Sequence, residues 1–91
     1  MGKYNTNDEI AGRIRVYLFE NFLFGYSDDE LENNASFLEL GILDSTGIME
    51  LVAFIEREFS IDVLDNEIIP DNLDSIDCIS NFILKKTNAE N

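Results

Sequence analysis

The apolar residues of this chain recur mainly at the spacing of amphipathic helices. Near the N-terminus one buried stripe is formed by side chains at i, i+4, i+7, i+8 and i+12, namely Ile10, Ile14, Tyr17, Leu18 and Phe22. Thr6 and Glu9 have the spacing of a capping box, which satisfies free amides at a helix start, and Gly25 suits a helix stop. The pattern predicts a first helix that begins after Thr6 and ends before Gly25.

A long connection follows, from Gly25 to Asp44, in which no helical period is sustained. Such connections are uncommon in a small domain, and they are usually functional or held in place by their own side chains. We expect Phe37, Leu38 and Leu40 to hold this connection.

A second amphipathic helix, about 14 residues long, is predicted after three consecutive N-cap candidates, Asp44, Ser45 and Thr46. Its buried stripe contains Ile48, Leu51, Val52, Ile55 and Phe59. Met49 and Ala53 fall outside this stripe and one turn apart. This apolar pair is a candidate contact surface.

The last third of the chain predicts a loop, one short helix near residues 65–69 that ends at Pro70, and a final helix capped by Asp74 or Ser75. The stripe of the final helix is Ile76, Ile79, Phe82 and Ile83.

Lys85 and Lys86 suit the negative end of that helix, and residues 87–91 are expected to fray. We therefore expect one all-α domain over residues 1–91, a small four-helix bundle of three main helices and one short one. Its folded part should span residues 7–86, with flexible ends at 1–5 and 87–91.

Composition supports a single folded domain. The 91 residues are 45% hydrophobic and 11% aromatic, which suffices for one core and is too apolar for a disordered chain. The longest apolar stretch, Val16–Phe24, is nine residues long and contains Glu20, well short of the roughly 20 residues that cross a bilayer.

The net charge of the chain disfavours some classes of binding partner. The formal net charge is −13, and between Val16 and Leu84 sixteen acids face only one base, Arg57. Nucleic acid and anionic membranes would repel such a chain. The acids either form a solvated surface or steer basic partners toward the protein, and none has the spacing of an EF-hand loop. We expect no metal site and a soluble, cytoplasmic monomer.

The chain lacks residues for independent catalysis. It has no histidine, and Cys78 is its only cysteine, so it has no intrachain disulfide, no Cys-rich metal site and no Ser-His or Cys-His pair. Cys78 falls beside the buried stripe of the last helix and is interpreted as a core residue. We expect no enzymatic activity and a reducing compartment.

Ser45 has two competing interpretations. A serine before an amphipathic helix is most often its N-cap. Asp44 and Thr46 could also cap, however, and a helix N-terminus favours a phosphate attached there. No histidine or lysine nearby in sequence could activate the hydroxyl, so Ser45 is better suited to be modified by another enzyme than to act as a nucleophile.

The segment from Phe37 to Leu51, FLELGILDSTGIMEL, resembles the attachment site of acyl carrier proteins, in which a leucine-rich loop leads through an Asp-Ser pair into the second helix. The segment FSIDV at residues 59–63 and the last helix at 76–83 also resemble this family. The similarity covers roughly residues 8–86.

The resemblance implies a four-helix bundle with 4'-phosphopantetheine joined to Ser45 through a phosphodiester. The thiol of this arm would carry acyl groups as thioesters between enzymes of a fatty-acid, polyketide or specialised acyl pathway. A holo-acyl-carrier-protein synthase, a phosphopantetheinyl transferase, would install the arm from coenzyme A, with Asp44 near its magnesium ion. Acyl-loading ligases or acyltransferases would be further partners. The apolar stripes would line a space for acyl chains. The second helix would be the face read by partners, through Thr46, Met49, Glu50, Ala53 and Glu56.

The chain departs from fatty-acid carriers in two respects. Thr46 follows the Asp-Ser pair where leucine is common, and Gly47 and Arg57 stand where carboxylates are frequent. Leu43-Asp44-Ser45 followed by Gly47 is also similar to D-alanyl carrier proteins and to carriers served by adenylate-forming ligases. An aminoacyl carrier is therefore the alternative, and an unmodified helical interaction domain is a third possibility.

Overall fold

The computed structural model describes residues 6–23, 25–27 and 30–89, and no strand occurs among them. The long helices are α1 (Asn7–Asn21), α3 (Ser45–Phe59) and α5 (Ile76–Ala89). The short elements are α2 (Phe37–Leu40), the 3-10 turn η2 (Asp65–Glu67) and α4 (Pro70–Leu73). The predicted all-α fold with three main helices is confirmed.

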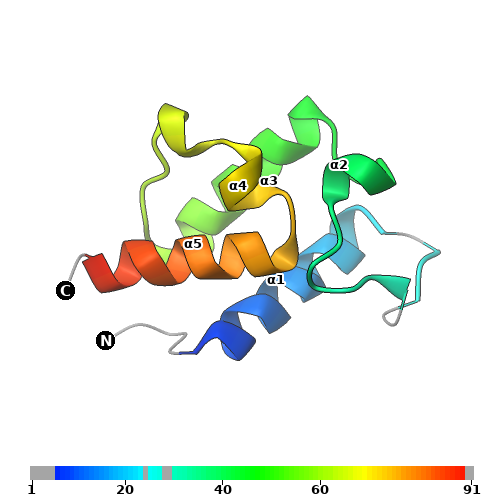
Figure 1. Ribbon diagram of the computed structural model, residues 1–91, viewed down its shortest axis with the longest axis horizontal. Helices are drawn as coiled ribbons and strands as arrows, with labels where there is room; N and C mark the ends of the chain where they lie inside the picture. Colours follow the sequence, from blue (N-terminus) through cyan, green and yellow to red (C-terminus); the bar gives the residue numbers. More distant parts are fainter. Residues whose placement is uncertain (1–5, 24, 28–29, 90–91) are drawn as a thin grey trace.

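Two of the long helices, α1 and α5, lie side by side and run in opposite directions, and α4 packs on α5 (Figure 1). Rings of α1 and α3 stack on each other, Tyr17 on Phe54, with centroids 4.0 Å apart. The core draws on every α-helix and on the connections, and its fully buried large side chains are Ile10, Ile14, Leu18, Leu23, Leu31, Phe37, Leu51, Ile55, Leu73, Ile76, Ile79 and Ile83.

Helix α1 begins as predicted. The Glu9 amide donates to Thr6 Oγ1 and the Thr6 amide donates to Glu9 Oε1, each at a distance of 3.1 Å, and these two hydrogen bonds complete a capping box. The helix ends at Asn21, and the Phe22 amide donates to the Leu18 carbonyl at 2.8 Å, which closes the last turn. Gly25, with φ of +89°, lies beyond that end in a left-handed conformation.

The first connection is held by only one of the three predicted side chains. Phe37 is buried as expected, together with Leu31 and Leu43. The prediction was wrong for Leu38 and Leu40, which are 59% and 50% exposed. Residues 37–40 form the single helical turn α2, and because each residue turns about 100° around a helix axis, burial of Phe37 leaves the adjacent Leu38 outside. Leu40 is the last residue of this turn, directly before Gly41 takes the left-handed conformation with φ of 68°.

The segment before α5 contains two short elements where one was predicted. The turn η2 falls within the expected range but ends at Glu67, and the prediction that Pro70 ends a helix was wrong, because Pro70 begins α4. Proline suits the first helical position because the amide it lacks would have no partner there.

Helix α5 is capped by Ser75, whose Oγ accepts from the Cys78 amide at 3.0 Å. The helix continues through residues 87–89, beyond the predicted end at 86, and the Thr87 hydroxyl donates to the Ile83 carbonyl at 3.0 Å. The expected flexible ends at 1–5 and 90–91 lie outside the described residues.

Two searches of the described residues give negative results. They contain no helix that is both long and apolar enough to span a bilayer. They also contain no group of three or more cysteine or carboxylate side chains placed to hold a metal ion.

Candidate functional site

The start of α3 separates the capping residue from the predicted attachment residue. Asp44 is the N-cap, since its Oδ1 accepts from the Gly47 amide at 2.7 Å. Ser45 is the first helical residue and is exposed. Within the described part of the chain the Ser45 hydroxyl makes no hydrogen bond, so it is not the cap that local sequence statistics favour. The fold leaves this hydroxyl free.

Gly47 allows the first turn of α3 to pack closely. A Cβ atom at this buried position would lie 3.2 Å from Leu43 Cδ2, 3.3 Å from Asp44 Oδ1 and 3.3 Å from Phe22 Cε1. These distances are shorter than ordinary van der Waals contacts. A side chain at this position would therefore require Leu43, Asp44 or Phe22 to shift by a few tenths of an ångström, which glycine avoids.

The connection that leads to Ser45 is fastened to the segment between α4 and α5. The Asp74 carbonyl accepts from the Phe37 amide at 2.8 Å, and the Asp74 carboxylate accepts from the Leu38 amide at 3.0 Å and from the Ser36 hydroxyl. The Asp77 amide donates to the Asn33 carbonyl at 2.9 Å. Asp74 was one predicted cap for α5, and the structure gives it this cross-link instead.

An apolar groove opens beside Ser45. Its volume is about 460 Å³, and it is lined by Leu38, Leu43, Asp44, Ser45, Ile48, Met49 and Ile68. A smaller hollow shares Leu38, Ile48 and Ile68 and continues to Pro70 and Leu73. Leu38, which was expected to hold the loop, thus forms a wall of this Ser45 groove.

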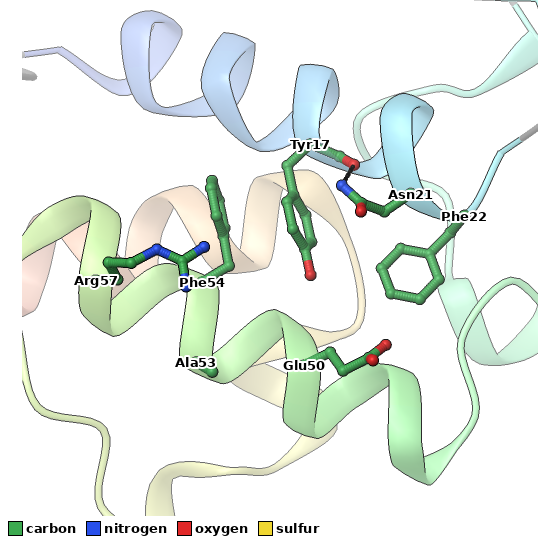
Figure 2. A pocket seen from close by; sticks show the side chains of 7 residues that line it. All are labelled: Tyr17, Asn21, Phe22, Glu50, Ala53, Phe54 and Arg57. Carbon is green, nitrogen blue, oxygen red and sulfur yellow. Dashed lines mark hydrogen bonds between the residues drawn. The ribbon is translucent and has the colours of Figure 1, made fainter.

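A second groove of about 460 Å³ lies between α1 and α3 (Figure 2). Its lining combines aromatic, amide and charged side chains, namely Tyr17, Asn21, Phe22, Glu50, Ala53, Phe54 and Arg57. The Tyr17 ring stacks on Phe54 and meets the Phe22 ring edge-on, with centroids 5.8 Å apart. Burial, and secondly the Glu50 carboxylate, raise the pKa of Tyr17 above its ordinary value, while Arg57 opposes this shift. We call this the α1–α3 groove.

Three of the five predicted partner-binding residues line one of these two grooves. Thr46, Met49, Glu50 and Ala53 are exposed on α3. Met49 lines the Ser45 groove, whereas Glu50 and Ala53 line the α1–α3 groove.

Glu56 differs from the other four, because it is partly buried and its Oε2 accepts from the Val63 amide at 2.9 Å. Its carboxylate holds the chain that leaves α3.

Sequence reasoning missed most of the groove linings. Ile68 falls within the short helix predicted near residues 65–69 and received no further role, and Tyr17 was assigned only to the buried stripe of the first helix. No local signal identifies them as lining residues, because each meets α3 only through the tertiary fold. Cys78, which was interpreted as structural, is partly buried on α5.

The chain is similar to a known protein family. A family model described as a phosphopantetheine attachment site matches residues 23–82, which is more than half of the chain. The matched range includes α2, α3, α4 and the first half of α5.

Proposed function

Because the chain belongs to the phosphopantetheine attachment family, we propose that it is an acyl carrier protein in which the Ser45 Oγ bears 4'-phosphopantetheine. When attached, this group supplies a thiol that holds acyl cargo as a thioester. Carrier domains of this family are generally not catalytic and are acted on by a phosphopantetheinyl transferase and by acyl-handling enzymes. The assignment of the site rests mainly on the Ser45 hydroxyl, which is exposed and makes no hydrogen bond among the described residues. It is not needed as the helix cap because Asp44 caps α3.

The residues around Ser45 fit a phosphodiester. The first turn of a helix has amides without intrahelical acceptors, and only the Gly47 amide is taken by Asp44. The amides of Ser45 and Thr46 therefore remain to offset negative charge, and the helix dipole adds to this effect. The fastened connection before α3 keeps the hydroxyl at one place on the surface.

Asp44 has two roles in this proposal, one in the helix cap and one toward the transferase. Its Oδ1 orders the first turn through the Gly47 amide. The side chain is exposed, so the carboxylate is accessible to the magnesium ion of a transferase bound at Ser45.

The test is incubation with a broad-specificity phosphopantetheinyl transferase and coenzyme A, followed by intact-mass measurement and peptide mapping. The wild-type chain should gain one phosphopantetheine, and Ser45→Ala should gain none. Ser27→Ala, which removes an exposed serine from the first connection, is the matched control and should be loaded like wild type. Modification of Ser45→Ala, or none of wild type, would refute the assignment.

We further propose that partners read the exposed face of α3, through Thr46, Met49, Glu50 and Ala53. This rests on an exposed apolar pair beside a carboxylate and next to the attachment site. Met49→Glu should slow cargo loading while helicity stays unchanged. Leu64→Glu is a suitable control because Leu64 is 57% exposed, close to the 55% of Met49, and lies outside α3. Equal loading rates for wild type and Met49→Glu would remove this face from the proposal.

The pathway divides into two candidates. The first is transfer of acyl intermediates in a fatty-acid, polyketide or specialised acyl pathway of the cytoplasm, supported by the apolar groove next to Ser45. The second is a D-alanyl or aminoacyl carrier loaded by an adenylate-forming ligase. The polar lining of the α1–α3 groove favours this second candidate.

A further inference from the structure

Several polar groups of the α1–α3 groove have no partner among the described residues. The Glu50 carboxylate and the Tyr17 hydroxyl make no hydrogen bond or ion pair there. Asn21 Nδ2 donates to the Tyr17 carbonyl at 2.9 Å, which orients the amide so that Oδ1 faces the groove (Figure 2). Some other carboxylates among the described residues are engaged by bases, for example Glu58 by Arg13 and Glu67 by Lys86.

These groups converge at one end of the groove. Figure 2 shows the Glu50 carboxylate below the Phe22 ring, the Tyr17 hydroxyl reaching from α1 toward α3, and Asn21 Oδ1 closer to α1. A carboxylate, an amide oxygen, a hydroxyl and an aromatic ring form a set that suits a small ammonium group, which donates up to three hydrogen bonds and is attracted to ring faces.

Building on the proposed function, we propose that this end of the α1–α3 groove binds the amine of an aminoacyl cargo carried on Ser45. The protein would then bind amine-bearing cargo against α3, and acyl groups that lack an amine would not bind there.

The groove is within reach of a tethered cargo. Thr46, Glu50 and Ala53 follow one another at i, i+4 and i+7 and therefore lie on one stripe of α3, which begins beside Ser45. Glu50 is five residues beyond Ser45, roughly 7.5 Å along the axis at the helical rise per residue. The phosphopantetheine arm is longer than this distance, so cargo can fold back to Glu50.

The charge distribution favours a cation over an anion at this end. Arg57 lies seven residues beyond Glu50, roughly 10 Å along the axis, at the other end of the groove. The Glu50 carboxylate contributes, after burial, to raising the pKa of Tyr17, which fits its place at the same end of the groove, while Arg57 opposes this shift. A net charge of −13 also favours a cation.

A basic side chain of a partner protein would meet the same acceptors. A cargo attached to Ser45 is present at a high effective concentration, in the millimolar range for a short flexible tether, without any partner being bound. The tether therefore favours cargo as the occupant.

The experiment compares two cargoes of the same shape on the full chain. A broad-specificity transferase loads Ser45 from stable amide analogues of the coenzyme A thioesters, carrying either an alanyl or an isobutyryl group, in which a methyl replaces the ammonium. Intact mass verifies loading. Backbone amide chemical shifts of Tyr17, Asn21, Phe22 and Glu50 are then measured by NMR, relative to the chain that bears the arm without cargo.

The alanyl cargo should shift these four signals, and the isobutyryl cargo should not. The shifts should be lost in Glu50→Gln and kept in Glu39→Gln, which neutralises an exposed carboxylate on α2. Equal shifts with both cargoes, no shift with either, or shifts that appear only when a loading enzyme is added would each overturn amine binding and leave the carrier function intact. Failure of loading would instead refute the carrier function, and this inference with it.

Discussion

The proposed attachment site depends on which of two neighbouring residues, Asp44 or Ser45, caps α3. Asp44 caps α3 and Ser45 is left with a free hydroxyl. Replacing Asp44 by alanine should cost about 1 kcal/mol of unfolding free energy, the usual value of a lost N-cap, whereas Ser45→Ala should cost clearly less. Urea denaturation of both variants measures the difference. Equal losses would mean that both side chains contribute to the cap.

The pair formed by Lys86 and Glu67 should make stability depend on pH. Lys86 Nζ lies 2.8 Å from Glu67 Oε1, and the Leu64 amide donates to the same oxygen at 2.9 Å. The hydrogen bond from Lys86, and secondly that from Leu64, lower the pKa of Glu67 below its ordinary value of 4.5.

Because the folded-state pKa is the lower one, the stabilisation is fully present above the ordinary pKa and is lost as pH falls through the lowered value. The difference in unfolding free energy between wild type and Glu67→Gln should therefore be constant near neutral pH and shrink below about pH 5. Lys86→Met, which removes the main cause, should weaken the same dependence. A difference that does not change with pH would contradict this account.

At the scale of the elements, Asp74 fastens the first connection to the bundle. Its carbonyl and carboxylate together accept three hydrogen bonds, from Ser36, Phe37 and Leu38. Loss of the carboxylate in Asp74→Ala should cost about 1–3 kcal/mol, because the Leu38 amide and the Ser36 hydroxyl lose their acceptor. Hydrogen exchange should also accelerate over residues 33–41. Asp71→Ala, at an exposed position of α4, is the control, and similar losses in both variants would exclude this role for Asp74.

Helices with local signals were predictable from sequence, and turns that depend on distant partners were not. The Thr6–Glu9 capping box lies within four residues and was confirmed. The turn α2 depends on Asp74, which is distant in sequence, so the pattern did not indicate it. Pro70 was expected to stop a helix because proline disfavours the helical conformation of the residue before it, but proline also suits the first position of a helix, as in α4.

The same division applies to the site. The proposal of Ser45 and Asp44 came from the resemblance of the segment around them to the attachment site of acyl carrier proteins. The exposure of Met49 and Ala53 on α3 could be predicted from the helical period of the adjacent sequence. The α1–α3 groove could not, since Tyr17 and Glu50 come together only when α1 packs on α3.

At the scale of the whole molecule, net charge should limit stability. The chain carries a net charge of −13, and domains of this size have an unfolding free energy of only about 5–14 kcal/mol. Mutual repulsion of the carboxylates is therefore large enough to reduce that free energy noticeably. Raising the ionic strength should increase the melting temperature, because salt screens charges beyond a Debye length of about 10 Å at 0.1 M. Sodium chloride and magnesium chloride series would both show this increase. A melting temperature that stays constant from low to high salt would contradict the prediction.

The central claim is that Ser45 carries the phosphopantetheine arm, and it is tested most directly on protein isolated from its own cells. Intact-mass spectrometry under conditions that preserve thioesters, followed by peptide mapping, should find phosphopantetheine on the peptide that contains Ser45, with any cargo as additional mass. Phosphopantetheine on a different residue would contradict the claim. So would a chain that is unmodified in the cell and stays unmodified after treatment with a transferase and coenzyme A.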